Sequence, residues 1–126
     1  MGLLIVEDDS DVCESICVTL KNTDGFDYEI FVATDMFQAM SLYSDNTTIK
    51  VVLTDIKIEG KRLNGLDLVK VFRKNNITIP IIIFTGYDTL DFRKEAYILN
   101  VIHFLKKPDD LDKISHIVKS LIHENI

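Results

Sequence analysis

The stretch that decides the fold is LLIVEDD, residues 3–9, in which four apolar residues run directly into three acids. An unbroken apolar run of this length is typical of a strand that is buried on both faces, as in a parallel sheet. The carboxyl ends of parallel strands are also where such sheets bind ligands. The stretch therefore predicts a central parallel strand that ends in an acidic site.

Four further apolar runs follow, and segments with helical spacing separate them. The five runs are residues 3–6, 28–32, 50–53, 79–84 and 101–105. Between them, apolar positions recur three and four residues apart, as at Cys13, Ile16, Cys17 and Leu20. Candidate N-cap residues stand ahead of the helical segments: Asp9 or Ser10, Thr34, Asn64, Asp88, and Asp109 or Asp110. Strict alternation of strand and helix predicts a three-layer α/β fold, with helices on both faces of a five-stranded parallel sheet.

The character of each run predicts its place in the sheet. The first, third and fourth runs are almost wholly apolar, so we expect them in the centre. The second run alternates around Glu29 and the fifth contains His103, which suits the two edges. Pro80 lies at the start of the fourth run, where a missing hydrogen-bond donor is tolerated. The strand order 2-1-3-4-5 fits this division into central and edge strands.

Length and composition limit the classes of protein to consider. The 126 residues predict one domain, residues 1–126, and the 47% of hydrophobic and 27% of charged residues are typical of soluble globular proteins. A net charge of −6 without a cluster of basic residues argues against direct binding to nucleic acid. No apolar run is long enough to span a membrane, so we expect a cytoplasmic protein. Cys13 and Cys17 have no partners at zinc-ligand spacing, and we expect both to be small buried hydrophobic residues.

Polar and charged residues follow four of the predicted strands. The first strand runs into Glu7 and Asp8, the third into Asp55, the fourth into Thr85, and the fifth into Lys107. Because the strands are parallel, these ends meet at one edge of the sheet. Crowded carboxylates repel one another unless a cation lies among them, and magnesium suits one or two carboxylates together with water and phosphate oxygens. The acids therefore predict a magnesium site.

The same set of side chains suits phosphoryl transfer. Asp55 can attack phosphorus as a nucleophile to give an acyl phosphate, while Lys107 pairs with the phosphoryl oxygens. Thr85 can donate a hydrogen bond from its hydroxyl group. A single acid at a strand end more often caps the next helix, as we expect of Asp9. Four strand ends that supply one complementary set favour a functional site.

With these motifs the sequence resembles the response regulator receiver family over essentially the whole chain. The matching motifs are the strand and acidic pair of residues 4–8, Asp55, Thr85-Gly86 and Lys107-Pro108. The resemblance implies a flavodoxin-like (βα)5 fold and a phosphoryl transfer to Asp55 from a sensor histidine kinase, a phosphotransfer protein or a small phosphodonor. It implies a two-component signalling switch that catalyses only its own phosphorylation and dephosphorylation, and is otherwise not an enzyme.

The resemblance also implies how the metal ion is held. Magnesium would bind to Asp8, Asp55 and the main-chain carbonyl of Lys57. Glu7 would act mainly through water.

A switch and a partner surface are further implications of the resemblance. The added charge of the phosphoryl group would draw Thr85 inward, and an aromatic side chain would rotate into the vacated space. Phe104 occupies that aromatic position, where a simple core phenylalanine is an equal alternative. The last two helices and the last strand, with Tyr97, Leu99 and Ile102, form a face that often binds an output domain or a second copy in the family. Core packing explains these three residues as well.

The segment after Asp55 departs from the family pattern. Gly65 stands ten positions after Asp55, a larger spacing than is usual in the family, and Ile58-Glu59 replaces the common Met-Pro pair. The tip at residues 60–62 is either a solvated insertion or an element that contacts a partner. This loop is the feature that favours an alternative, a pseudo-receiver that serves as an interaction module and is never phosphorylated.

Two enzyme-like alternatives fit the sequence less well. The signature of phosphohydrolases with an aspartate nucleophile requires a second Asp two positions later, where this chain has Lys57. A nucleotide-binding domain needs a glycine-rich phosphate loop after the first strand, and this chain is acidic there. The sequence therefore favours a phosphoacceptor switch over either enzyme.

Overall fold

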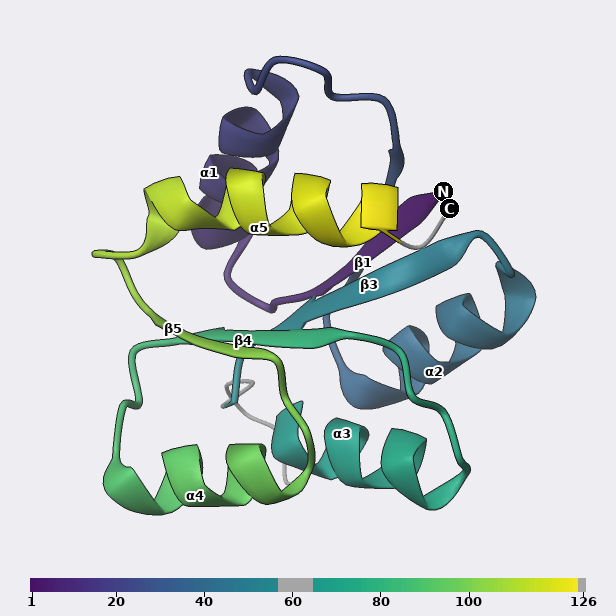
Figure 1. Cartoon of the computed structure of the whole chain (residues 1–126), viewed down its shortest axis with the longest axis vertical. Helices are drawn as coiled ribbons and strands as arrows, with labels where there is room; N and C mark the ends of the chain where they lie inside the picture. The colour runs from purple at the N-terminus through teal and green to yellow at the C-terminus, as the bar shows by residue number, and fades with distance from the viewer. Residues whose placement is uncertain (57–64, 125–126) are drawn as a thin grey trace.

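The structure is a computed structural model that describes residues 1–56 and 65–124. Its elements, in chain order, are β1 (Gly2–Val6), α1 (Ser10–Lys21), β2 (Glu29–Ala33), α2 (Met36–Asp45), β3 (Ile49–Thr54), α3 (Gly65–Lys74), β4 (Ile81–Thr85), α4 (Leu90–Ile98), β5 (His103–Lys106) and α5 (Leu111–Glu124). Figure 1 shows the sheet in the middle of the molecule, with α1 and α5 on one side and α2, α3 and α4 on the other. The predicted three-layer α/β fold is confirmed.

The sheet has five parallel strands in the order β2-β1-β3-β4-β5, as the sequence predicts. Every residue of β1 and β4 is buried, whereas the edge strand β2 exposes Glu29 and Val32. Pro80 precedes β4, and its carbonyl accepts a hydrogen bond of 3.0 Å from the backbone N–H of Val52. Proline therefore fits beside a central strand because it contributes an acceptor there and no donor.

Apolar side chains fill both faces of the sheet. On one face, residues such as Leu20 of α1 and Val118 of α5 pack against the strands, and on the other face Ala39 of α2 and Phe72 of α3 do so. A smaller cluster of Ile56, Leu66, Ile83 and Ala96 joins β4 to α3 and α4. Within the described ranges, no helix is both long enough and apolar enough to cross a bilayer.

The two cysteines differ from expectation in their degree of burial. Cys13 and Cys17 are free thiols, and both are half-buried on α1 rather than fully buried. They still pack against the core on that face of the sheet. Burial, together with the nearby Cys17 thiol, raises the pKa of Cys13 to about 11, so its thiol is protonated near neutral pH.

The first helix begins where the sequence predicts. Asp9 is the N-cap of α1, and its Oδ1 accepts hydrogen bonds from the backbone N–H groups of Asp11 at 2.9 Å and Val12 at 3.2 Å. Asn64 lies outside the described residues. Asp110 directly precedes α5, and its carboxylate accepts a hydrogen bond of 2.8 Å from the N–H of Lys106.

The N-cap predictions for Thr34 and Asp88 are wrong by one residue. Asp35 caps α2 and accepts from the N–H of Gln38, while the side-chain carbonyl of Gln38 accepts from the N–H of Thr34. This reciprocal pair satisfies two backbone donors, which favours Asp35 over its neighbour. Thr89 caps α4, which leaves the Asp88 carboxylate to bind a side chain of the helix instead.

Candidate functional site

Two buried carboxylates follow neighbouring strands. Val6 at the end of β1 pairs with Thr54 at the end of β3, and the N–H of Asp55 donates to the carbonyl of Val6 at 3.2 Å. This register brings Glu7 and Asp55 to the same edge of the sheet. Glu7 is only 4% exposed and Asp55 only 7%. Buried carboxylates are costly unless they are paired, so they require a cation.

Lys107 supplies a positive charge to both carboxylates. Its Nζ lies 2.8 Å from Asp55 Oδ2 and forms a second ion pair with Glu7 Oε1. Burial alone would lower the pKa of Lys107, but hydrogen bonds from its ammonium to Asp55 and Glu7 outweigh this effect and raise it. The predicted convergence of Asp55 and Lys107 is present, and the direct pairing of Glu7 with Lys107 was not anticipated. One ammonium thus serves two buried anions.

Glu7 shows the cost of this crowding. Burial raises its pKa above the ordinary value, and the charge of Asp55 adds to the increase. The hydrogen bond and the charge of Lys107 oppose both effects without cancelling them. Two buried carboxylates thus share the one ammonium of Lys107.

Thr85 lies beside this ion-pair cluster at the end of β4. It is fully buried, it pairs with Lys106 across the β4–β5 ladder, and its carbonyl accepts a hydrogen bond of 2.9 Å from the N–H of Lys107. The Thr85 hydroxyl oxygen accepts from the N–H of Tyr87 at 3.1 Å. In the described part of the chain, no acceptor receives the proton of that hydroxyl, which is thus available to donate to a ligand.

The second carboxylate oxygen of Asp55 differs from the first in its surroundings. Asp55 Oδ1 is buried, and within residues 1–56 and 65–124 no group donates a hydrogen bond to it. A buried anionic oxygen without a donor is unusual in folded proteins. A metal ion or an incoming electrophile would satisfy Oδ1 while Oδ2 stays paired with Lys107.

The remaining candidate metal ligands are less closely assembled. Asp8 is half-buried two residues beyond β1, and it makes no ion pair or hydrogen bond to Asp55 or Lys107 among the described residues. Lys57, whose carbonyl was a predicted ligand, lies outside those residues. In the part of the chain that the structure describes, no three His, Cys, Asp or Glu side chains are arranged to hold a metal ion. The predicted metal set of Glu7, Asp8, Asp55 and Lys57 therefore stays a prediction, with the unpaired Asp55 Oδ1 as the observation that suits it.

Gly65, the first residue of α3, lies against the backbone of the site. Its N–H donates to the carbonyl of Ile56 at 2.7 Å. A Cβ atom at Gly65 would lie 1.7 Å from the carbonyl oxygen of Asp55 and 2.9 Å from Thr54 Oγ1. The absence of a side chain at this position therefore allows α3 to approach Asp55.

Phe104, the predicted switch residue, lies on β5 next to the site. It pairs with Ile83 of β4 and is half-buried against the small apolar cluster beneath α4. The guanidinium carbon of Arg93 lies 4.6 Å from the centroid of its ring. Phe104 is therefore neither a fully buried core residue nor a freely exposed one.

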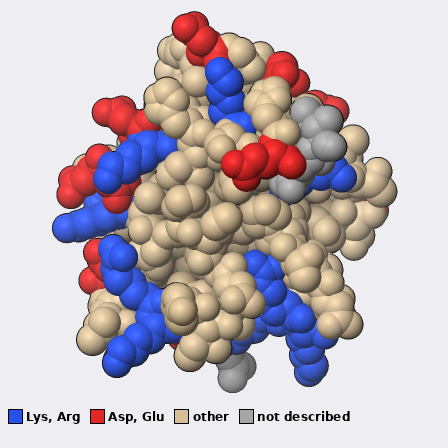
Figure 2. All heavy atoms as spheres, viewed as in Figure 1, with Lys and Arg blue, Asp and Glu red and all other residues tan. Residues whose placement is uncertain are grey.

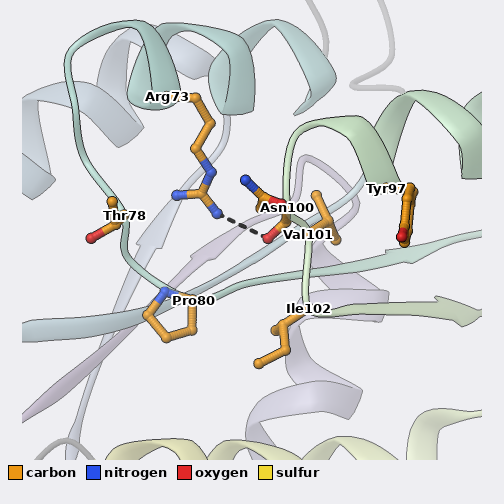
Figure 3. A pocket seen from close by; sticks show the side chains of 7 residues that line it. All are labelled: Arg73, Thr78, Pro80, Tyr97, Asn100, Val101 and Ile102. Carbon is orange, nitrogen blue, oxygen red and sulfur yellow. Dashed lines mark hydrogen bonds between the residues drawn. The ribbon is translucent and has the colours of Figure 1, made fainter.

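The role of an arginine at the other end of the strands, where β4 and β5 begin, was missed in the sequence analysis. Arg73 of α3 donates hydrogen bonds to the carbonyls of Leu99 at 2.8 Å, Ile77 at 2.8 Å, Ile79 at 3.0 Å and Asn100 at 3.2 Å. Figure 3 shows its guanidinium between the loop that follows α3 and the loop that follows α4. Arg73 also lines a pocket of roughly 350 Å³ there. These contacts span up to 27 residues in sequence, so helical periodicity carries no sign of them.

Replacing Arg73 with methionine should lower the free energy of unfolding by about 2–4 kcal/mol, because four carbonyls lose charge-assisted hydrogen bonds at once. Arg73→Lys should restore little of this, since an ammonium cannot reproduce the planar fork. Urea unfolding of these variants would measure the loss. Lys74→Met, at the exposed neighbouring position, is the control and should stay close to wild type. Equal stability of Arg73→Met and Lys74→Met would contradict the prediction.

Charge on the surface is unevenly distributed. Figure 2 shows Asp and Glu side chains mostly in the upper half of that face, whereas Lys and Arg side chains lie in both halves. Lys70 of α3 pairs with Glu95 of α4, and Arg93 of α4 pairs with Asp88. Part of the positive charge is thus neutralised locally.

The chain matches a known family over most of its length. Residues 3–119 match the response regulator receiver domain. A putative NtrX-like response regulator from Rickettsia bellii is 29% identical over 119 residues, which are 94% of this chain and 24% of that protein. Sporulation initiation phosphotransferase F from Bacillus subtilis is 29% identical over 120 residues, which are 95% of this chain and 92% of that protein. The chain thus spans about a quarter of the NtrX-like relatives it matches.

Solved structures agree with this match. The receiver domain of the Francisella response regulator 1452 superposes with a TM-score of 0.85 at 26% identity, over 99% of this chain and 98% of that one. The strand order of this chain, β2-β1-β3-β4-β5, is that of the flavodoxin-like fold that the resemblance implies. The chain therefore belongs to the response regulator receiver domain family.

Proposed function

We propose that residues 1–126 form a phosphoacceptor switch of a two-component phosphorelay, in which Asp55 accepts a phosphoryl group in a magnesium-dependent reaction. The observation that carries the proposal is the asymmetry of the Asp55 carboxylate. One oxygen is paired with Lys107, and the other is buried without a donor in the described residues. Such a carboxylate is held in place and still has a lone pair to offer an electrophile.

In the proposed reaction, Asp55 Oδ1 attacks the phosphorus of a phosphohistidine or a small phosphodonor. The P–O bond forms as the bond from phosphorus to the leaving group breaks, and the product is an acyl phosphate. Lys107 already pairs with Oδ2 and would also pair with the phosphoryl oxygens. The Thr85 hydroxyl group would donate a hydrogen bond to one of them. The burial of Asp55 excludes most water from the anhydride.

A magnesium ion, when bound, would add positive charge to the site. Asp55 and Asp8 are its proposed ligands, together with the main-chain carbonyl of Lys57. Glu7, proposed to act through water, is also held by Lys107, so it would share its charge between the ammonium and the ion. The raised pKa of Glu7 and the unpaired Asp55 oxygen support a cation at this position.

The partners that we propose are a sensor histidine kinase or phosphotransfer protein as donor, and an output domain or a second copy of this chain as receiver of the signal. The face of α4, β5 and α5 is the proposed output surface. Tyr97 is 83% exposed, Ile98 75% and Ile102 48%, whereas Leu99 packs into the core. We also propose a cytoplasmic location, no binding to nucleic acid or membrane by this segment, and no catalysis beyond self-phosphorylation and self-dephosphorylation.

Incubation with acetyl phosphate and magnesium should add one phosphoryl group to the wild-type chain and none to Asp55→Asn, as measured by intact mass. Asp9→Asn is the matched control, because Asp9 is exposed and caps α1 through an oxygen that asparagine retains. This variant should be phosphorylated like the wild type. Excess EDTA should suppress the reaction in both. A wild-type chain that gains no phosphoryl group under these conditions would favour the pseudo-receiver alternative.

A further inference from the structure

The ring of Phe104 is covered by a charged side chain that is itself held in place. The guanidinium carbon of Arg93, on α4, lies 4.6 Å from the ring centroid, which is within cation–π range. The same guanidinium forms a fork with Asp88: Nη2 donates to Oδ2 at 2.9 Å, and Nε donates to Oδ1. The carboxylate fixes two of the guanidinium nitrogens, so the plane above the ring is held rather than mobile.

Asp88 connects this arrangement to the phosphoacceptor site. It stands three residues after Thr85, in the loop between β4 and α4. The Thr85 hydroxyl also accepts from the N–H of Tyr87, so that loop is tied to the side chain that would contact a phosphoryl group. A displacement of Thr85 toward Asp55 would therefore shift the position of Asp88. Because Asp88 binds the Arg93 guanidinium, that shift would also move the guanidinium relative to the Phe104 ring.

We propose that Arg93, held by Asp88, is a positioning residue that keeps Phe104 in its half-buried orientation until the site is phosphorylated. This rests on the proposed function of Asp55 and extends it to residues outside the site. Phenylalanine has no hydroxyl group, so no hydrogen bond from the edge of the ring can fix its orientation. The cation–π contact fixes the ring through its face instead.

The contact acts on the conformational equilibrium because it belongs to one state. Inward rotation of the ring takes its face away from the guanidinium, so the contact stabilises the unphosphorylated conformation and is lost in the other. Removing it should shift the population toward the phosphorylated-like conformation. An exposed cation–π contact is worth a shift of about two- to fivefold in that equilibrium. Arg93 has a side chain that is 46% exposed, so its replacement is not expected to prevent folding.

The test compares Arg93→Gln with Lys94→Gln. Both substitutions remove one positive charge from adjacent exposed positions of α4, and only the first removes the guanidinium from Phe104. The first readout is the ¹⁹F resonance of 4-fluorophenylalanine placed at position 104 in the unphosphorylated protein. The second is the beryllofluoride concentration that half-saturates the protein at fixed magnesium, followed by amide spectra. Asp88→Asn should change both readouts in the same direction as Arg93→Gln but by less, because it weakens the hold on the guanidinium without removing it.

The proposal expects Arg93→Gln, and not Lys94→Gln, to move the resonance and to lower the half-saturating beryllofluoride concentration about two- to fivefold. In a Phe104→Leu background, Arg93→Gln should leave the half-saturating beryllofluoride concentration unchanged, since there is no ring to position. Equal behaviour of Arg93→Gln and Lys94→Gln would overturn the proposal. So would an Arg93→Gln effect that persists without the ring, because the arginine would then act through the loop alone.

These outcomes are separable from failure of the proposed function. If the wild-type chain binds no beryllofluoride, the phosphoacceptor proposal fails. The ¹⁹F comparison in the unmodified protein then still decides whether Arg93 positions the ring. If beryllofluoride binds and the Arg93→Gln resonance matches the wild type, the phosphoacceptor proposal stands and the positioning role is refuted.

Discussion

Replacing Lys107 with methionine should destabilise the metal-free protein by about 3 kcal/mol, because it leaves two buried carboxylates without their shared cation. Glu7 and Asp55 are 4% and 7% exposed, and the Lys107 ammonium pairs with both. Methionine has a similar length, so the loss of packing is small and the loss of charge dominates. Urea unfolding in the presence of EDTA would measure the change.

Asp55→Asn is the informative partner of that variant. It removes one of the two anions that compete for Lys107, and the charge of Asp55 is one cause of the raised pKa of Glu7. We therefore expect Asp55→Asn to stabilise the metal-free protein by about 1 kcal/mol and to reduce the cost of Lys107→Met when the two are combined. If Lys107→Met were as stable as the wild type, the ammonium would not be neutralising the site, and the description of this cluster would be wrong.

Replacing Gly65 with alanine should destabilise the protein strongly, because among the described glycines it is the one at which a Cβ atom would meet backbone most closely. The new Cβ would lie 1.7 Å from the carbonyl oxygen of Asp55 and 2.8 Å from its carbonyl carbon. Both atoms belong to the backbone, so α3 or the end of β3 must shift to relieve the overlap. We expect a loss of roughly 3–5 kcal/mol in unfolding free energy, together with slower phosphorylation, because Asp55 is displaced from Lys107.

Gly86→Ala provides the matched control for this change. Gly86 follows Thr85 at the same edge of the sheet, and a Cβ atom there would meet nothing within 4 Å. Its stability and its rate of phosphorylation by acetyl phosphate should both stay near those of the wild type. A Gly65→Ala variant as stable and as reactive as Gly86→Ala would contradict the prediction, because α3 would then accommodate a side chain beside Asp55.

Most of the fold could be predicted because it depends on local patterns. The apolar character of β1, β3 and β4 against the mixed β2 and β5 separated central strands from edge strands, since burial on both faces is decided by each strand's own residues. The full order 2-1-3-4-5 also drew on the resemblance to the family. The ends of helices were less certain. Where Thr34 or Asp88 competes with the next residue, the winner depends on a reciprocal contact such as that of Gln38, which a single-residue preference does not contain.

The site could be predicted in part, since its chemistry is carried by residues directly after strands. The pairing of Asp55 with Lys107 follows from parallel strands and opposite charges. The fork of Arg93 on Asp88 and the four carbonyls bound by Arg73 could not be predicted. Both arginines lie on helices at positions that a solvent-exposed charge would also occupy, and nothing in the periodicity distinguishes the two cases.

The attachment of Arg73 to Leu99 and Asn100 makes the two ends of α4 unequal. The C-terminal end of α4 is hydrogen-bonded to Arg73 of α3, which also binds the loop that follows α3. The first turn of α4 instead adjoins the loop that carries Asp88. A reorientation of this helix would then be a rotation about its C-terminal end near Asn100. Leu90, at the other end, would undergo the largest displacement, and Tyr97 would move little. A partner on the proposed output surface would therefore contact Tyr97 in both states, and its additional contacts near Leu90 would distinguish the two states.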